Sequence, residues 1–131
     1  MLERLPHQGV ATRLGVSKIH GVGVFAIEAI DKDTKVFAHD QGEIHWINAS
    51  EIKAACIHPQ LRAFYQDFAI RQNGMLGCPA SFDLLTPGWY VNQPENGETA
   101  NLRASADFQF FASRDIQPDE ELTVAYSTFS A

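Results

Sequence analysis

Two glycines near the start of the chain form the first pattern that could carry chemistry. Gly21 and Gly23 lie in the run Gly-Val-Gly-Val-Phe-Ala, which fits the G-x-G-x-x-A pattern of dinucleotide-binding turns. That function requires a helix directly after the glycines, but residues 24–27, Val-Phe-Ala-Ile, form a short run of strand-favouring character. We therefore favour a hairpin turn at residues 20–23, in which glycine provides a positive φ. Such a turn can also expose its backbone to a ligand, because no Cβ blocks the approach.

Two later blocks place polar side chains beside aromatic ones. The first, residues 89–101, contains Asn92, and the second, residues 110–126, contains Glu120-Glu121 and ends at Tyr126. Each has an ordinary interpretation. Asparagine favours turns, paired acids favour a solvated face, and tyrosine often packs in a core with its hydroxyl bonded. No Ser-His-Asp or Cys-His arrangement that would mark a nucleophilic enzyme stands out in the chain.

The order and spacing of these blocks resemble the SET-domain family. The matching segments are Gly-x-Gly-x-Phe-Ala, an aromatic-Val-Asn loop ending in Ala-Asn, Phe-Ala-x-Arg-Asp-Ile, and Glu-Glu-Leu-Thr-x-x-Tyr. The run Asp-Glu-Glu-Leu-Thr-Val-Ala-Tyr over residues 119–126 is the most specific of them. The resemblance covers residues 12–126 with a variable middle, and we treat residues 1–131 as one domain.

The resemblance implies a fold of the α+β class that is mainly β. Several small curved sheets would surround a C-terminal pseudoknot, in an arrangement similar to a β-clip. In this chain Leu122–Tyr126 would pass beside Asn92–Asn101.

The resemblance also implies an activity and a site. SET domains bind S-adenosylmethionine and transfer its methyl group to a protein lysine, so a protein-lysine N-methyltransferase is expected. Tyr126 would be the catalytic residue at the methyl-transfer point. Tyr90 and Phe129 would line the substrate channel, although packing in the core explains these aromatic residues equally well. The cofactor would be bound by Lys18, His20, Gly21, Val22, Gly23, Asn92 and Gln93.

The chemistry of methyl transfer accounts for these residue types. The lysine amine must attack as a free base, although its pKa in water is about 10.4. Burial beside a cationic sulfonium lowers that pKa through desolvation and like charge together. A narrow aromatic channel provides the desolvation and fixes the line of approach.

The chain departs from the family pattern in three ways. Gln93 stands where the family usually has histidine, and the loop 94–101 lacks the usual Ser-Cys. Only residues 127–131 follow Tyr126, so Phe129, a second subunit or the substrate would complete the channel. The alternative to an enzyme is therefore a degenerate SET module that binds cofactor or a protein partner without catalysis, and a homodimer is a further expectation.

Short β-prone runs and two helices are expected to position these blocks. Thr12–Ile19 and Val24–Ile27 should form a hairpin, and Asn73-Gly74 predicts a tight turn. One helix should begin after cap residues at Asn48 and end near His58-Pro59, and a second should run from Pro59 to about Phe68. The remaining short strands are expected at residues 34–38, 43–47, 108–112 and 122–126. The absence of βαβ alternation favours an α+β fold.

An apolar stripe is predicted on the second helix. Leu61, Phe64, Tyr65 and Phe68 recur at helical spacing, so we expect this face to be directed at the core.

Composition and charge exclude several classes of function. The 131 residues are 45% hydrophobic and 20% charged, which suits one globular domain. No apolar stretch is long enough to span a bilayer and no leader peptide is visible, so a cytoplasmic protein without membrane contact is expected. The formal net charge of −6 argues against direct binding to nucleic acid. It fits simple solubility, or a basic partner such as a lysine-rich peptide.

A metal site is not expected. Cys56 and Cys78 are too few and too far apart for a zinc cluster, and the five histidines have no metal-binding spacing. Both thiols are expected to be reduced and partly buried.

Overall fold

Short strands in three small sheets make up most of the fold. The computed structural model describes residues 5–6, 9, 11–38, 43–55 and 58–128. Its strands are β1 (Thr12–Val16), β2 (Val22–Ala26), β3 (Lys35–Val36), β4 (His45–Asn48), β5 (Ile70–Gln72), β6 (Met75–Cys78), β7 (Leu102–Ala104), β8 (Phe110–Ala112) and β9 (Glu121–Leu122). Its α-helices are α1 (Ala49–Ala55) and α2 (Pro59–Phe68), and the 3-10 turns are η1 (Phe82–Leu84), η2 (Pro87–Tyr90) and η3 (Tyr126–Thr128). The α+β, mainly β class is confirmed.

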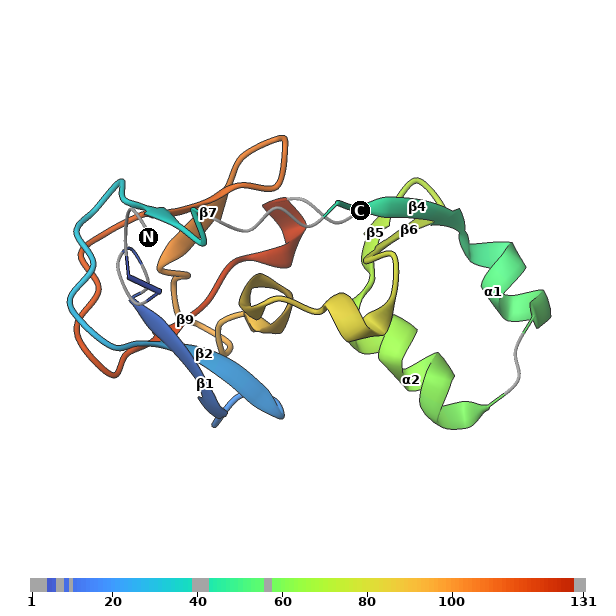
Figure 1. The fold of residues 1–131 in the computed structure, drawn as a ribbon, viewed down its shortest axis with the longest axis horizontal. Helices are drawn as coiled ribbons and strands as arrows, with labels where there is room; N and C mark the ends of the chain where they lie inside the picture. Colours follow the sequence, from blue (N-terminus) through green and yellow to red (C-terminus); the bar gives the residue numbers. More distant parts are fainter. Residues whose placement is uncertain (1–4, 7–8, 10, 39–42, 56–57, 129–131) are drawn as a thin grey trace.

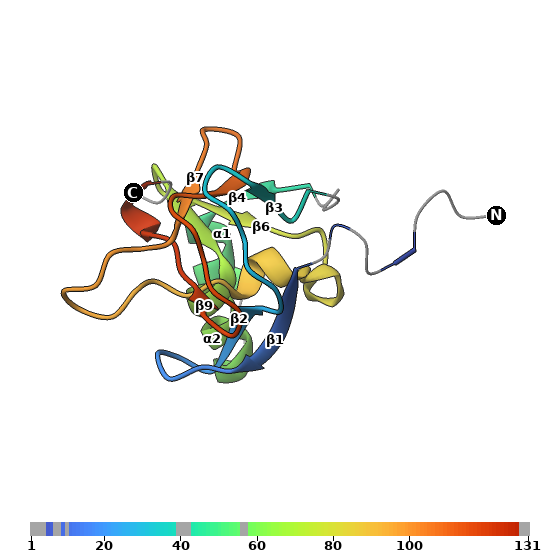
Figure 2. The same ribbon diagram turned by 90° about the vertical axis from the view of Figure 1, so that its left-hand side faces the viewer.

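The three sheets each hold three strands, in the orders β1-β2-β9, β3-β8-β7 and β4-β6-β5. All pairings between these strands are antiparallel. Figure 1 shows the β4-β6-β5 sheet with α1 and α2 at one end of the molecule and β1, β2, β7 and β9 at the other. Figure 2, turned by 90°, shows β1, β2 and β9 side by side. None of the helices in the described segments is long and apolar enough to span a bilayer.

The hairpin β1-β2 decides against the dinucleotide-binding interpretation of the glycine pattern. Residues 22–26 form a strand that pairs with β1 in a register that sets Gly15 opposite Gly23. The helix that a dinucleotide turn needs is therefore absent from this place, and that alternative was wrong. Gly21, with φ +47°, supplies the left-handed backbone that turns the chain between the strands.

A second hairpin, β5-β6, turns at Asn73-Gly74 as predicted. Both residues have positive φ, at 51° and 77°, which is the geometry of a type I′ turn. This turn matches the right-handed twist of the two strands that it joins. The strands themselves, Ile70–Gln72 and Met75–Cys78, were not predicted, because the runs are short and lack clear alternation.

The main core gathers apolar side chains from β2, β9 and the segments around them. Val24, Ile116 and Leu122 are fully buried, and burying each such side chain stabilises the fold by about 2 kcal/mol. Cys78 is also buried, as predicted, and burial raises the pKa of its thiol. The second cysteine, Cys56, lies outside the described residues. The core cluster consists of Val24, Ala26, Ile30, Val36, Val91, Leu102, Ala112, Ile116, Leu122 and Val124.

The segment after β9 runs between two loops that lie far away in sequence. Val124 donates its N–H to the carbonyl of Asn92 at 3.0 Å, and Leu102 donates to Thr123 at 2.9 Å. Both contacts are parallel bridges, on either side of the same segment. The predicted passage of residues 122–126 beside Asn92–Asn101 is confirmed.

The buried side chain of Asn101 fastens this segment. It is only 2% exposed, and its Oδ1 accepts the N–H of Thr123 at 2.8 Å. Its Nδ2 donates to the carbonyl of Glu121 at 2.8 Å and to the carboxylate of Glu120 at 3.0 Å. Burial opposes ionisation of Glu120, but hydrogen bonds from Arg114 and Asn101 outweigh it and hold the pKa of that carboxyl below its ordinary value.

Helix α2 has the predicted bounds but not the predicted burial. His58 caps it by accepting the N–H of Gln60 at 3.1 Å, and proline occupies the first turn. The stripe expected to face the core is only partly covered. Leu61 is 40% exposed and Phe64 is 41% exposed. The prediction of a core-facing stripe was therefore wrong in this part, because the main core lies at the other end of the molecule.

Asn101→Leu should lower the free energy of unfolding by about 3 kcal/mol, because it leaves the N–H of Thr123 and the carbonyl of Glu121 buried without their partner. Urea unfolding followed by circular dichroism measures this. The same change at the exposed Asn96, Asn96→Leu, should alter stability by less than about 0.5 kcal/mol. Equal losses in the two variants would mean that Asn101 does not hold the segment.

Candidate functional site

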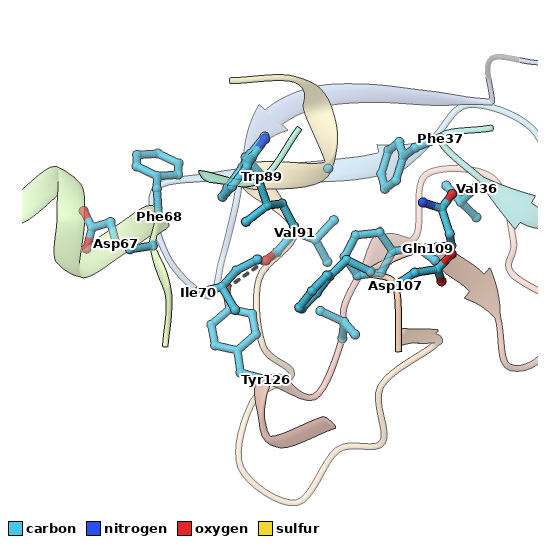
Figure 3. A pocket seen from close by; sticks show the side chains of 16 residues that line it. Val36, Phe37, Asp67, Phe68, Ile70, Trp89, Val91, Asp107, Gln109 and Tyr126 are labelled. Atoms are coloured by element: carbon cyan, nitrogen blue, oxygen red, sulfur yellow. Dashed lines mark hydrogen bonds between the residues drawn. The ribbon is translucent and has the colours of Figure 1, made fainter. Parts of the chain in front are cut away.

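Two adjacent cavities meet around Tyr126. The loop cavity, of about 400 Å³, lies against residues 19–22 of the β1-β2 turn and residues 92–94 after η2. The aromatic cavity is smaller, about 150 Å³, and Figure 3 shows the side chains around it. Five residues line both cavities and form their shared wall: Asp67, Phe68, Trp89, Val91 and Tyr126.

Tyr126 is held at the junction by hydrogen bonds at both ends of the residue. Its hydroxyl donates to the carbonyl oxygen of Val91 at 2.8 Å, as drawn in Figure 3. Its backbone N–H donates to Oε1 of Gln93 at 3.1 Å. Both partners belong to the segment that follows η2, so the position of the phenol is tied to the wall of the loop cavity.

The phenol of Tyr126 stays protonated at neutral pH. Burial raises the pKa of Tyr126 above its ordinary value, and the charges of Asp67 and Glu121 raise it further. A backbone hydrogen bond at Gln93 acts in the opposite direction but does not cancel the rise. A neutral hydroxyl can orient a reacting group through hydrogen bonds, and it is too weak a base to remove a proton from an ammonium group.

The amide of Asn92 holds the β1-β2 turn against the rest of the site. This side chain is buried, and its Nδ2 donates to the carbonyl of His20 at 3.0 Å and to Oγ of Ser17 at 3.1 Å. It also donates to Oε2 of Glu121 at 3.0 Å, and the hydroxyl of Ser17 donates to the same carboxylate at 2.8 Å. Asn92 therefore shapes the loop cavity through its amide nitrogen, while the residue itself forms part of the cavity wall.

Gly21 and Gly23 have different roles in this loop. A Cβ on Gly21 would meet no atom within 4 Å, so its backbone faces open space, and the residue lines the loop cavity. A Cβ on Gly23 would collide with the carboxylate of Glu121, whose Oε2 and Cδ lie against that position. Gly23 therefore makes room for the Asn92–Glu121 contact and does not line the cavity.

The structure brings together most of the side chains predicted for the site. The loop cavity is lined by His20, Gly21, Val22, Tyr90, Asn92, Gln93 and Tyr126. Two predicted residues lie elsewhere: Lys18 is exposed and outside the cavity lining, and Gly23 is buried beneath Glu121. Phe129 lies outside the described residues.

The prediction missed the part of the site that α2 contributes. Asp67 and Phe68 line both cavities, and Oδ1 of Asp67 lies 3.7 Å from Nε2 of His20, which also lines the loop cavity. Phe68 packs edge-on against Tyr90, with ring centroids 5.2 Å apart. The only signal in the sequence was the end of the apolar stripe, which looks the same whether it faces a core or a cavity.

Two phenylalanines of the aromatic cavity have a strained backbone. Phe37 and Phe108 have φ of 59° and 63°, a left-handed conformation that costs a residue with a Cβ about 1–2 kcal/mol. Phe37 packs edge-on against Phe110, and Phe108 packs against Trp46, each with centroids 5.9 Å apart. Such conformations persist where the surroundings fix them, and they concentrate at functional sites.

In the described part of the chain, no group of three or more His, Cys, Asp or Glu side chains could hold a metal ion. The residues that line the two cavities supply hydrogen-bonding groups, aromatic walls and carboxylates.

Comparison with known proteins identifies the family. The sequence model of the SET domain matches residues 21–127. The chain belongs to the SET-domain family. The match begins at Gly21 and ends one residue after Tyr126, so it includes the threaded segment, the aromatic cavity and all of the loop-cavity lining except Ile19 and His20. No curated protein matches this chain significantly.

Solved structures of SET domains have the same fold. A Plasmodium falciparum protein, provisionally named a histone methyltransferase, is 21% identical with a TM-score of 0.59, over 89% of this chain and 93% of the other. The methyltransferase domain of human PR domain-containing protein 2 is 23% identical with a TM-score of 0.56, over 92% and 77%. A humanized Chaetomium thermophilum Polycomb Repressive Complex 2, bound to an inhibitor, is 22% identical with a TM-score of 0.57, over 92% of this chain and 15% of that chain. The chain thus has a SET-type methyltransferase fold.

The raised pKa of Tyr126 gives a prediction for alkaline pH. The folded state keeps the phenol protonated above the unfolded pKa of about 10, so this contribution to stability is complete below pH 10 and is lost as pH rises through the folded pKa. Tyr126→Phe should therefore be less stable than the wild type at pH 8, because it loses the bond to Val91. The difference should shrink by pH 11, and urea unfolding at the two pH values measures it. A difference that grows with pH would contradict the direction of the shift.

Proposed function

We propose that the protein is an S-adenosylmethionine-dependent methyltransferase that methylates a lysine amine of a protein or peptide. The observation that carries this proposal is the pair of cavities that share a wall at Tyr126. One cavity has the size of a small-molecule pocket and includes the open backbone of Gly21, and the other is smaller and has aromatic walls. Transfer between two substrates requires such a junction, where both reacting atoms can approach each other.

The residues of the loop cavity fit S-adenosylmethionine. Its volume of about 400 Å³ lies within the range of small-molecule pockets. The open backbone at Gly21 allows close approach, and Trp89 and Tyr90 offer apolar surface. The cofactor, when bound, would supply a methyl group on a positively charged sulfur. The neighbouring carboxylate of Asp67 favours a positive charge at this place.

The aromatic cavity would prepare the amine. Phe37, Phe108 and Phe110 help to line a space of about 150 Å³, in which a slender aliphatic chain such as that of lysine would fit. Removing the amine from water disfavours its charged form and lowers its pKa, as the attack of a free base requires. The walls also fix the direction in which the amine meets the junction.

Tyr126 would orient the amine at the junction. Its protonated hydroxyl and the carbonyl of Val91 lie in the shared wall, 2.8 Å apart. Together they offer hydrogen-bonding atoms to a nitrogen that arrives from the aromatic cavity. The proton of the ammonium group leaves to solvent, because the phenol is too weak a base to accept it.

Gln93 bears on the alternative of a degenerate module. Its side chain binds the backbone N–H of Tyr126 at 3.1 Å, so this departure from the family pattern still fastens the tyrosine to the wall of the loop cavity. That contact supports the active enzyme over a module without catalysis. Homodimer formation and a cytoplasmic location stay predictions from the sequence.

A methyl-transfer assay with labelled S-adenosylmethionine and a panel of lysine peptides and basic proteins tests this function. We expect transfer by the wild type and a loss of about a hundredfold in kcat for Tyr126→Phe. The loss is expected because the phenyl ring keeps the wall but removes the orienting hydroxyl.

Tyr65→Phe serves as the matched control. Tyr65 lies on α2, packs against Phe82 and lines neither cavity. It should retain wild-type transfer. No transfer to any member of a broad panel, or equal rates in the two tyrosine variants, would overturn the proposal.

A further inference from the structure

The rim of the aromatic cavity carries charges of one sign. Asp67 and Asp107 are the charged residues that line it, and Figure 3 shows them on different sides of the space. No lysine, arginine or histidine lines this cavity in the described part of the chain. A substrate therefore meets a negative rim around an apolar interior.

The turn between β7 and β8 presents Asp107 in a fixed way. The hydroxyl of Ser105 bonds to Oδ1 of Asp107, and the same oxygen of Ser105 accepts the N–H of Gln109 at 3.1 Å. The backbone of Ser105 is bonded to Gln109 at 2.8 Å and to Phe108 at 3.0 Å. These hydrogen bonds close the turn, in which the backbone of Phe108 has a left-handed conformation.

An exposed aromatic side chain packs against this turn. The ring of Trp46 packs on Phe108, the neighbour of Asp107, and Trp46 is 39% exposed. Asp107 thus precedes in sequence the ring on which the exposed indole packs, and a carboxylate and an indole face each attract a cationic side chain, through charge and through cation–π attraction. The acidic chain as a whole, with a net charge of −6, favours the same kind of ligand.

We propose that Asp107 is a specificity-determining residue that binds a second cationic side chain of the substrate, next to the lysine that enters the aromatic cavity. This inference rests on the proposed function and names its substrate more closely, as a lysine flanked on one side by arginine or lysine. Asp67 lines both cavities and its carboxylate lies 3.7 Å from Nε2 of His20, whereas Asp107 is exposed and lines the aromatic cavity alone. The two carboxylates thus act on different parts of the substrate.

A peptide series tests the proposal. Each short peptide has one central lysine among alanines, with a single arginine moved through the flanking positions. Arginine at one or two positions on one side should raise kcat/KM about threefold to fivefold at low salt, as expected for one exposed ion pair. In Asp107→Asn this preference for the arginine peptide over the alanine peptide should fall to about one.

Two further variants sharpen the result. Asp83→Asn removes the same charge from an exposed residue of η1 that lines neither cavity, and it should keep the arginine preference. Asp107→Lys should invert the preference, so that glutamate at the same peptide position is favoured over arginine. An arginine preference that survives in Asp107→Asn, or that falls equally in Asp83→Asn, would overturn the proposal.

Fluorescence anisotropy with the same peptides separates this proposal from the proposed function. Binding requires no methyl transfer, so an arginine-dependent affinity that Asp107→Asn abolishes supports the rim site even if no peptide is methylated. Transfer to lysine peptides without any arginine preference in rate or affinity would instead leave the methyltransferase in place and reject the role of Asp107.

Discussion

The hydrogen bonds from two buried asparagines hold the site together. Asn101 bonds to the backbone on both sides of Leu122, and Asn92 bonds to the β1-β2 turn and to Glu121. Because these contacts join segments that are 20 to 75 residues apart, each amide substitutes for a strand partner that the short sheets cannot provide. Without them the segment that carries Tyr126 would lack its place between the two loops.

This arrangement explains why small sheets suffice to build a precise site. The parallel bridges on both sides of Thr123 and Val124 add only a few backbone bonds. The buried amides add further bonds in a space that excludes water, where losing one partner is costly. Gly23 contributes to the same hydrogen-bonded arrangement, since any side chain there would displace the carboxylate of Glu121.

The sequence predicted the parts of the fold that depend on local signals. The glycine turn, the Asn73-Gly74 hairpin and the start of α2 at Pro59 follow from backbone preferences that act over a few residues. The order of motif blocks predicted the threaded segment. The strands β5 and β6 were not predicted, because a short strand in a small sheet is stabilised by pairing with its neighbours more than by its own sequence pattern.

The site was predictable to the extent that motif residues form it. His20, Gly21, Asn92 and Tyr126 gather as expected, whereas Lys18 does not line the loop cavity. Asp67 and Asp107 lie in segments outside the motifs, and nothing in their sequence surroundings distinguishes them from ordinary exposed acids. Their proposed roles follow from the aromatic cavity, which both residues line. A negative rim attracts an ammonium group but also favours its protonated form, so the aromatic interior must supply the desolvation that opposes this.

The central claim is that the loop cavity binds S-adenosylmethionine, and calorimetry tests it most directly. We expect a Kd well below 1 mM, where 1 mM corresponds to about −4 kcal/mol. Gly21→Val should abolish this binding by straining the turn, while Gly97→Val, at another positive-φ glycine away from the cavity, should retain it. No measurable binding to the wild type up to 1 mM, or equal binding by the two variants, would contradict the claim.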